Sequence, residues 1–106
     1  MTLDPRAEYD AIAAALAGAG VSSSQMFGVP CLKYGGKPFA TFHPDAMTFK
    51  LRPPEHAAAL ALPGAHLFDP SGAGRPMKEW VEVPAAHAAR WPEFAREALH
   101  YLASTL

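Results

Sequence analysis

The sequence has 106 residues and a formal net charge of −1; half of its residues are hydrophobic and 18% are charged. This length suits a single domain, residues 1–106, and this composition excludes a disordered chain. A net charge near zero argues against a strong nucleic-acid binder. No apolar run reaches the roughly 20 residues of a membrane span, and the first residues lack the pattern of a signal peptide. We therefore expect a cytoplasmic protein that does not enter a membrane.

The first predicted element is a helix over residues 4–17. Asp4 suits the N-cap, and Pro5 suits the first helical position, where its missing N–H costs nothing. Gly18 and Gly20 follow the segment and are typical of a helix end. One apolar stripe recurs at helical spacing and consists of Tyr9, Ile12, Ala13 and Leu16.

The middle of the chain is predicted to be rich in strands. Residues 25–28 are expected to form a short strand, and the serine run 22–24 before it is interpreted as a loop or helix end. Residues 30–34 and 37–43 flank Gly35-Gly36, a pair suited to a tight hairpin turn.

Two later segments alternate apolar and polar residues, which is typical of a strand with one buried and one exposed face. In residues 46–52, the side chains of Met47, Phe49 and Leu51 point one way, and those of Thr48, Lys50 and Arg52 point the other. In residues 77–83, Val81 and Val83 share one face, and the opposite face carries Lys78, Trp80 and Glu82. The alternation therefore places Lys50, Arg52, Lys78 and Trp80 on exposed faces.

The remaining elements complete the expected order. They are a short helix over 53–62, a brief strand over 66–68, a turn-rich loop over 69–74 and a final amphipathic helix over about 88–103. Pro92 is compatible with the final helix only if the helix begins near Arg90 or Trp91. Short connections favour antiparallel pairing. The predicted fold class is α+β, an antiparallel sheet of about four to five strands with N- and C-terminal helices packed on one face.

Several stretches, in this order, resemble the TfoX/Sxy N-terminal domain family: Met26-Phe27-Gly28, the hairpin 33–40, Phe49-Lys50-Leu51, and Gly74-Arg75-Pro76-Met77 followed by Trp80. The same stretches, with residues 78–81 and Val83-Pro84, are similar to the related MmcQ/YjbR-like proteins. The resemblance covers about residues 22–103. It implies a sheet flanked by terminal helices, a double-wing DNA-binding-like architecture and a role in transcriptional control of competence in some bacteria. It supplies no catalytic residues, and from a sequence that ends at Leu106 we do not expect the C-terminal helical domain of the full-length regulators.

Organised catalytic or metal-binding motifs are missing from the sequence. Cys31 is the only cysteine and is interpreted as a small buried hydrophobic residue, with a reactive thiol as the alternative. No two of the five histidines have the i, i+2 or i, i+4 spacing of paired metal ligands. Residues 71–76 are glycine-rich but lack the ending of a phosphate loop, so a plain turn is predicted. Glu79 and Glu82 are three apart in a strand and fall on opposite faces. We predict no catalytic residue, no metal and no cofactor.

The charges are unevenly distributed along the chain. Residues 1–20 carry a net charge of −2, residues 21–78 carry +3, and residues 79–106 carry −2. The total near zero therefore combines acidic helical ends with a basic, strand-rich middle. Basic groups beside an aromatic ring can hold a phosphate backbone and stack a base. The candidate residues for anion or nucleic-acid binding are Lys33, Lys50, Arg52, Arg75, Lys78 and Trp80. The alternative is a solvated sheet face whose edge lysines prevent aggregation.

Three function classes remain open at this point. We expect a small non-catalytic binding or regulatory module that contacts DNA or a transcription-related protein. The alternative is a protein-interaction module, for example a homodimer through a sheet edge, without nucleic acid. An enzyme or small-molecule-binding protein is the least favoured class, because the sequence shows no assembled set of acid, base and nucleophile.

Overall fold

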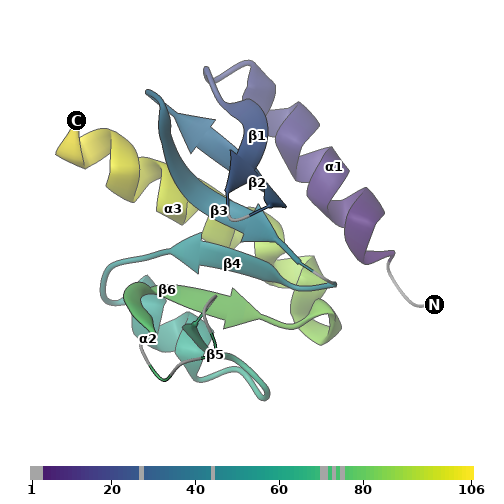
Figure 1. The fold of residues 1–106 in the computed structure, drawn as a ribbon, viewed down its shortest axis with the longest axis vertical. Coiled ribbons are helices and arrows are strands. Elements are labelled where there is room, and N and C mark those ends of the chain that lie inside the picture. Colours follow the sequence, from purple (N-terminus) through teal and green to yellow (C-terminus); the bar gives the residue numbers. More distant parts are fainter. Residues whose placement is uncertain (1–3, 27, 44, 70–71, 73, 75) are drawn as a thin grey trace.

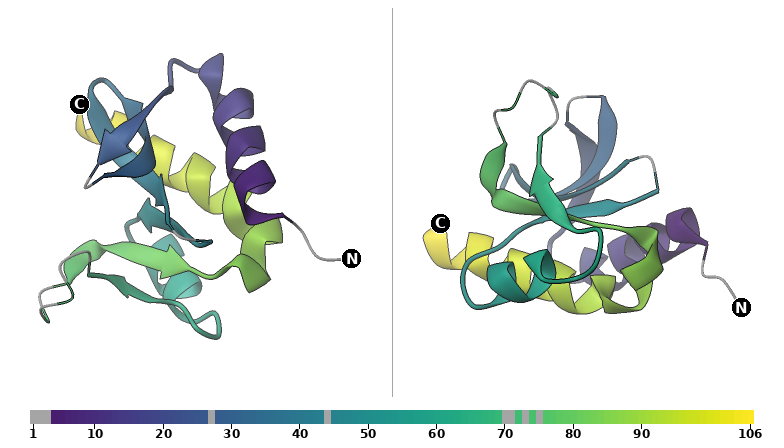
Figure 2. Two further views of the ribbon diagram at one scale, coloured as in Figure 1. Left: turned by 45° about the vertical axis from the view of Figure 1, so that its right-hand side comes forward. Right: turned by 90° about the horizontal axis from the view of Figure 1, so that it is seen from below.

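The computed structural model describes residues 4–26, 28–43, 45–69, 72, 74 and 76–106. Its elements follow in the order α1 (Pro5–Ala17), β1 (Ser22–Met26), β2 (Val29–Tyr34), β3 (Lys37–Phe42), β4 (Met47–Lys50), α2 (Glu55–Leu60), β5 (His66–Phe68), β6 (Met77–Val83), the 3₁₀ helix η1 (Ala85–Arg90) and α3 (Trp91–Thr105). The strands form one sheet, and the helices lie on the same side of it (Figures 1 and 2). The predicted α+β class is confirmed, with a sheet of six strands instead of four to five.

All neighbouring strands pair antiparallel, in the order β1-β2-β3-β4-β6-β5, so that β1 and β5 are the two edges. The predicted hairpin turn at Gly35-Gly36 joins β2 to β3. Both glycines have positive φ, +61° and +80°, which the two central residues of a type I′ turn require. The register between β2 and β3 shifts after Leu32, which leaves Phe39 as the extra residue of a bulge.

The main core lies between the sheet and α3. Trp91 and Phe94 are buried there, as the helical spacing predicts. Phe94 packs on Phe49 of β4 with ring centroids 5.9 Å apart. The Trp91 indole N–H donates to the Val83 carbonyl oxygen at 3.2 Å. This contact satisfies the polar end of the largest fully buried side chain and ties the start of α3 to the end of β6.

The start of α1 confirms the predicted N-terminal capping, whereas Gly18 at its end is right-handed (φ −67°) and only Gly20 has a positive φ, +89°. The Asp4 carboxylate accepts a hydrogen bond from the backbone N–H of Arg6 at 3.3 Å, and Pro5 begins the helix. Tyr9 and Ile12 are the buried residues of its apolar stripe. The Tyr9 ring lies 5.2 Å from the ring of Phe42, which packs α1 against β3.

Two element boundaries differ from the prediction. Residues 22–24 are not a loop or helix end but the first part of β1. Their side chains are exposed, so no hydrophobic alternation marks this edge strand in the sequence. The final helix is preceded by η1, and α3 itself begins at Trp91, so Pro92 falls in its first turn, where a proline is tolerated.

The sheet face opposite α3 is less exposed than its alternation predicts. Trp80 pairs across the strands with Lys50 on this face, yet it is only 6% exposed. Its ring packs 6.4 Å from the ring of Phe68 in the neighbouring edge strand β5. Thr48 is 1% exposed on the same face. Alternation predicts which way a side chain points, but it does not show what covers that side chain.

Candidate functional site

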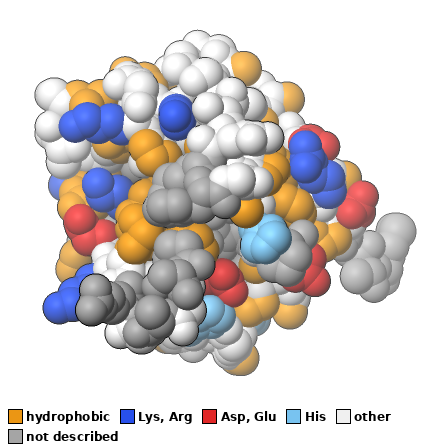
Figure 3. Space-filling model, viewed as in Figure 1, with side chains coloured by type: hydrophobic (Ala, Val, Ile, Leu, Met, Phe, Trp, Pro, Cys, Tyr) orange, Lys and Arg blue, Asp and Glu red, His pale blue; other side chains and the backbone are white. Residues whose placement is uncertain are grey.

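Lys33, Lys37, Lys50, Arg52 and Lys78 lie at one end of the sheet, and we call them the strand-end row. Strand direction produces this gathering: β2 ends and β3 begins at the same hairpin, and β4, antiparallel to β3, ends there too. β6 is antiparallel to β4 and therefore begins at this end. The space-filling view shows blue Lys and Arg side chains along the left of this face (Figure 3).

The strand-end row has no ion-pair partner among the residues that the structure describes. The cations on the helices behave differently. Arg6 pairs with Asp10 at 3.1 Å, and Arg90 pairs with Glu93 at 2.9 Å. The Arg90 guanidinium holds the pKa of the Glu93 carboxyl below its usual value. Of the described Lys and Arg side chains that have no ion-pair partner, all except Arg96 of α3 therefore lie at the strand ends.

Tyr101 of α3 contacts two members of the strand-end row, Lys50 and Arg52. The Lys50 Nζ lies 5.9 Å from the centre of its ring, and the Arg52 Cζ lies 5.5 Å from it. The Tyr101 hydroxyl donates to the Glu79 carboxylate, and this hydrogen bond raises the pKa of Tyr101. Sequence reasoning did not find Tyr101, because only the packing of α3 brings it to the ends of β4 and β6. Glu79 introduces one negative charge into this basic end.

The structure separates the predicted site residues into three groups. It brings Lys33, Lys50, Arg52 and Lys78 together. It contradicts the exposed position of Trp80, which is buried against Phe68 and does not offer its ring to a base. Arg75 lies outside the described residues.

The loop after β5 does not offer its glycine N–H groups to a phosphate. Asp69 accepts hydrogen bonds from the N–H of Gly72 at 3.1 Å and of Gly74 at 3.0 Å. An aspartate that bonds the following backbone in this way is typical of a turn. The predicted plain turn agrees with these contacts, although positions 71, 73 and 75 of that prediction lie outside the described residues.

The acidic and histidine side chains form separate local contacts. Glu82 pairs with His66 at 3.2 Å, and Glu79 contacts Tyr101, so the two carboxylates lie on opposite faces as predicted. The His56 Nε2 lies 2.8 Å from the Lys78 carbonyl oxygen, which ties α2 to β6. In the described part of the chain, no group of three or more His, Cys, Asp or Glu side chains is placed to hold a metal ion.

Cys31 has the surroundings of a structural residue. Its side chain is fully buried in β2, which confirms its interpretation as a small buried residue. Burial raises the pKa of its thiol. A protonated thiol without solvent access is a poor nucleophile.

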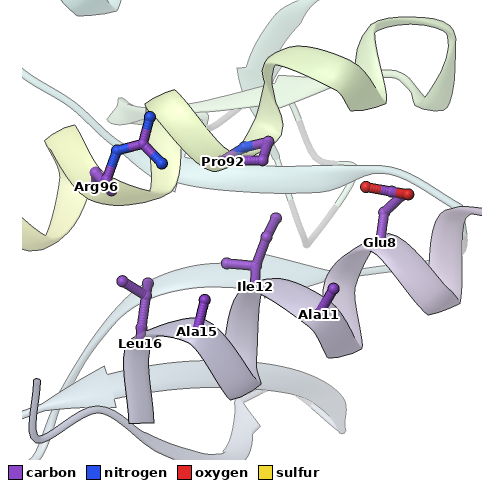
Figure 4. A pocket seen from close by; sticks show the side chains of 7 residues that line it. All are labelled: Glu8, Ala11, Ile12, Ala15, Leu16, Pro92 and Arg96. Carbon is purple, nitrogen blue, oxygen red and sulfur yellow. The ribbon is translucent and has the colours of Figure 1, made fainter. Parts of the chain in front are cut away.

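Two hollows lie beside α1. The first is an apolar groove between α1 and α3 with a volume of about 120 Å³, lined by Glu8, Ala11, Ile12, Ala15, Leu16, Pro92 and Arg96 (Figure 4). Its floor is aliphatic, and it brings no acid, base and nucleophile together. The second is a polar slot between α1 and β1 with a volume of about 280 Å³.

Tyr9 lines the polar slot and carries an unsatisfied group. Its side chain is 3% exposed, and its buried hydroxyl has no hydrogen-bond partner among the described residues. Burial, with a smaller contribution from the nearby Cys31 thiol, raises the pKa of Tyr9 to about 12. The phenol therefore remains protonated at neutral pH and keeps a donor available.

Replacing this hydroxyl is expected to stabilise the fold. Tyr9→Phe removes a buried polar group that lacks a partner, which should raise the free energy of unfolding at pH 7 by about 1 kcal/mol. The pKa of Tyr9 is about 12 in the folded state against 10.0 for a free tyrosine. The free energy of unfolding is therefore expected to fall as the pH rises from 10 towards 12, because the unfolded chain loses the Tyr9 proton at a lower pH than the folded chain does. Urea unfolding between pH 7 and 12 measures both effects.

The matched control for Tyr9→Phe is Tyr101→Phe, which removes an exposed hydrogen bond to Glu79. Because that hydrogen bond also raises the pKa of Tyr101, each variant should remove part of the loss of stability above pH 10, and only Tyr9→Phe should raise the free energy of unfolding at pH 7. A Tyr9→Phe protein that is less stable than the native chain at pH 7 would show that the hydroxyl has a stabilising partner.

Comparison with known proteins adds no relative from which a function is transferred. No family model, curated protein or solved structure matches the chain. Of the helices in the described ranges, none is both long and apolar enough to cross a membrane.

Proposed function

We propose that this domain is a non-catalytic binding or regulatory module that contacts the phosphate backbone of nucleic acid through the strand-end row. The observation that carries the proposal is the gathering of Lys33, Lys37, Lys50, Arg52 and Lys78 at one end of the sheet without carboxylate partners among the described residues. The resemblance of residues 22–103 to TfoX/Sxy N-terminal domains and YjbR-like proteins supports the same class. A cytoplasmic location in a bacterium belongs to this proposal.

The dimensions of the strand-end row suit a phosphate backbone. The row extends from β2 across β3 and β4 to β6. Neighbouring strands are about 4.8 Å apart, so three spacings give a row of roughly 14 Å. Phosphates follow one strand of duplex DNA at about 3.4 Å along the axis, so the row faces about four of them. Contacts to phosphates position a protein but carry no base sequence, and we expect binding that is weak and independent of sequence.

Reversing two charges of the row tests this function. Lys50→Glu with Lys78→Glu is expected to abolish binding to a 20-base-pair fluorescent duplex at low salt, measured by anisotropy and gel shift. For the native chain, the logarithm of the association constant should fall with the logarithm of salt with a slope of about −3 to −4, since about four phosphates are contacted.

The matched control carries the same change in net charge on α3. Arg90→Glu with Arg96→Glu should retain most of the affinity, because these cations lie outside the strand-end row. Circular dichroism of both double variants verifies that they are folded. Equal DNA affinity of the native chain and Lys50→Glu/Lys78→Glu would show that the strand-end row is not the binding surface. A salt-dependence slope near zero would show that phosphate is not the ligand.

A protein-interaction module without nucleic acid is the second candidate. The feature that favours it is β1, a sheet edge at which Ser22, Ser23, Ser24 and Gln25 are polar and carry no charge. Edge strands present unpaired backbone groups to other chains. Sedimentation over a range of protein concentrations distinguishes the candidates, since a homodimer through this edge would form without DNA and would depend little on salt.

A further inference from the structure

The polar slot lies between α1 and the edge strand β1. One wall consists of Arg6, Tyr9, Asp10 and Ala13 of α1, and the other consists of residues 23–25 of β1 with Pro30 of β2. Its cavity volume of about 280 Å³ lies just below the roughly 300–1,000 Å³ of ordinary ligand sites, so it suits a small ligand or a single extended segment. Figure 2 (left) shows α1 and β1 diverging from the short turn that joins the end of α1 to β1.

The pairing of β1 with β2 determines which backbone groups are left open. Gln25 lies opposite Pro30, which has no N–H, so this pair does not exchange two hydrogen bonds. Such pairs alternate with bonded pairs in an antiparallel ladder. The residues of β1 that bond inward to β2 are therefore Ser22, Ser24 and Met26. The N–H and C=O groups of Ser23 and Gln25 point outward, and no hydrogen bond in the described chain occupies them.

The edge at β1 lacks the features that usually protect a sheet edge. β1 contains no lysine and no proline, and residues 22–25 have exposed side chains. The opposite edge, β5, is only three residues long and has an irregular register with β6. Natural sheets protect an edge with charge, proline, irregular pairing or a covering element. An unprotected edge beside a slot is suited to receive another strand.

We propose that the slot between α1 and β1 binds an extended peptide segment of a partner protein, which adds to the sheet as a strand beside β1. The outward N–H and C=O groups of Ser23 and Gln25 pair with the backbone of the peptide. This inference is independent of the strand-end row.

An extended peptide fits this site better than a second copy of the chain. α1 forms a wall of the slot along β1. The β1 strand of a second copy would bring its own α1 into the same space, whereas a single extended segment has no such wall. The Arg6–Asp10 ion pair on α1 offers one charge of each sign to the side chains of the peptide.

A peptide selection on the full chain tests the proposal. A phage-displayed library of random heptapeptides is selected against the native protein, and the tightest peptide is synthesised with a fluorophore. Gln25→Pro removes only an outward N–H and is tolerated at a sheet edge. It should weaken binding by about tenfold or more, which is about 1.4 kcal/mol. Gln25→Ala is the matched control, since it keeps that N–H, and its affinity should stay within about twofold of native.

Lys50→Glu with Lys78→Glu should leave peptide affinity unchanged, which separates the slot from the strand-end row. If Gln25→Pro does not fold, a series of peptides is used instead. Each peptide is N-methylated at a different backbone amide, and its affinity for the native protein is measured. Loss of binding at alternate positions supports strand addition.

The proposal is overturned if selection yields no binding peptide, or if Gln25→Pro binds the selected peptide as well as Gln25→Ala does. It is also overturned if N-methylation has no alternating effect. A concentration-dependent dimer that Gln25→Pro abolishes would assign the edge to a second copy instead of a peptide.

Discussion

Trp91→Ala is expected to lower the free energy of unfolding by about 4 kcal/mol, because it removes a large, fully buried side chain and leaves a cavity. The Trp91 ring packs edge-on against Phe42 with centroids 6.4 Å apart, and its N–H bonds the Val83 carbonyl oxygen. A domain of this size has a total stability of roughly 5–15 kcal/mol. The variant should therefore unfold at a much lower urea concentration, monitored by circular dichroism at 222 nm.

Trp91→Phe separates the packing of this side chain from its hydrogen bond. Phenylalanine keeps most of the apolar contact but leaves the buried Val83 carbonyl without its donor, so a smaller loss of about 1–3 kcal/mol is expected. A loss below about 1 kcal/mol for Trp91→Ala would contradict the position of this residue at the centre of the core.

Trp80→Ala is expected to destabilise the domain by about 3 kcal/mol and to leave the affinity of the folded protein for duplex DNA unchanged. Trp80 is 6% exposed and packs on Phe68, so its removal opens a cavity between β5 and β6. Urea unfolding measures the stability, and anisotropy at a temperature where the variant is folded measures the affinity.

The opposite result follows if Trp80 is an exposed stacking platform, as strand alternation predicts. In that case Trp80→Ala would lose affinity for DNA and keep its stability. Trp80→Phe is the matched control, because it retains an aromatic contact with Phe68 and should lose less than about 1.5 kcal/mol. The pair of variants therefore distinguishes a packing residue from a ligand-binding residue.

Local signals were sufficient for most elements of the fold. Helix α1 follows from an N-capping Asp4, a proline at its first position and an apolar stripe, all of which are interactions within a few residues. The hairpin at Gly35-Gly36 follows from the positive φ that glycine permits. Strand β1 was partly missed because its exposed serines have no burial pattern, and its pairing with β2 is a contact between segments.

Part of the candidate site was also predictable from local signals in the sequence. Alternation places Lys50 and Arg52 on one face of a strand, and a charge count places excess positive charge in the middle of the chain. The order β2-β3-β4-β6 decides that Lys33, Lys37 and Lys78 join them. The packing of α3 decides that Tyr101 contacts Lys50 and Arg52. Neither pairing order nor helix placement is encoded in a short window of sequence.

The sequence by itself determined the class of fold, the apolar faces of the terminal helices and of β4 and β6, the buried character of Cys31 and the contrast between acidic helices and a basic middle. Each depends on spacing, local backbone preference or composition. Only the tertiary structure decided that Trp80 is buried, that the strand-end row forms and that a slot with an unpartnered Tyr9 hydroxyl lies beside the open edge of β1. Burial and proximity depend on which distant segments pack together, and periodicity along one strand or helix carries no information about its neighbour.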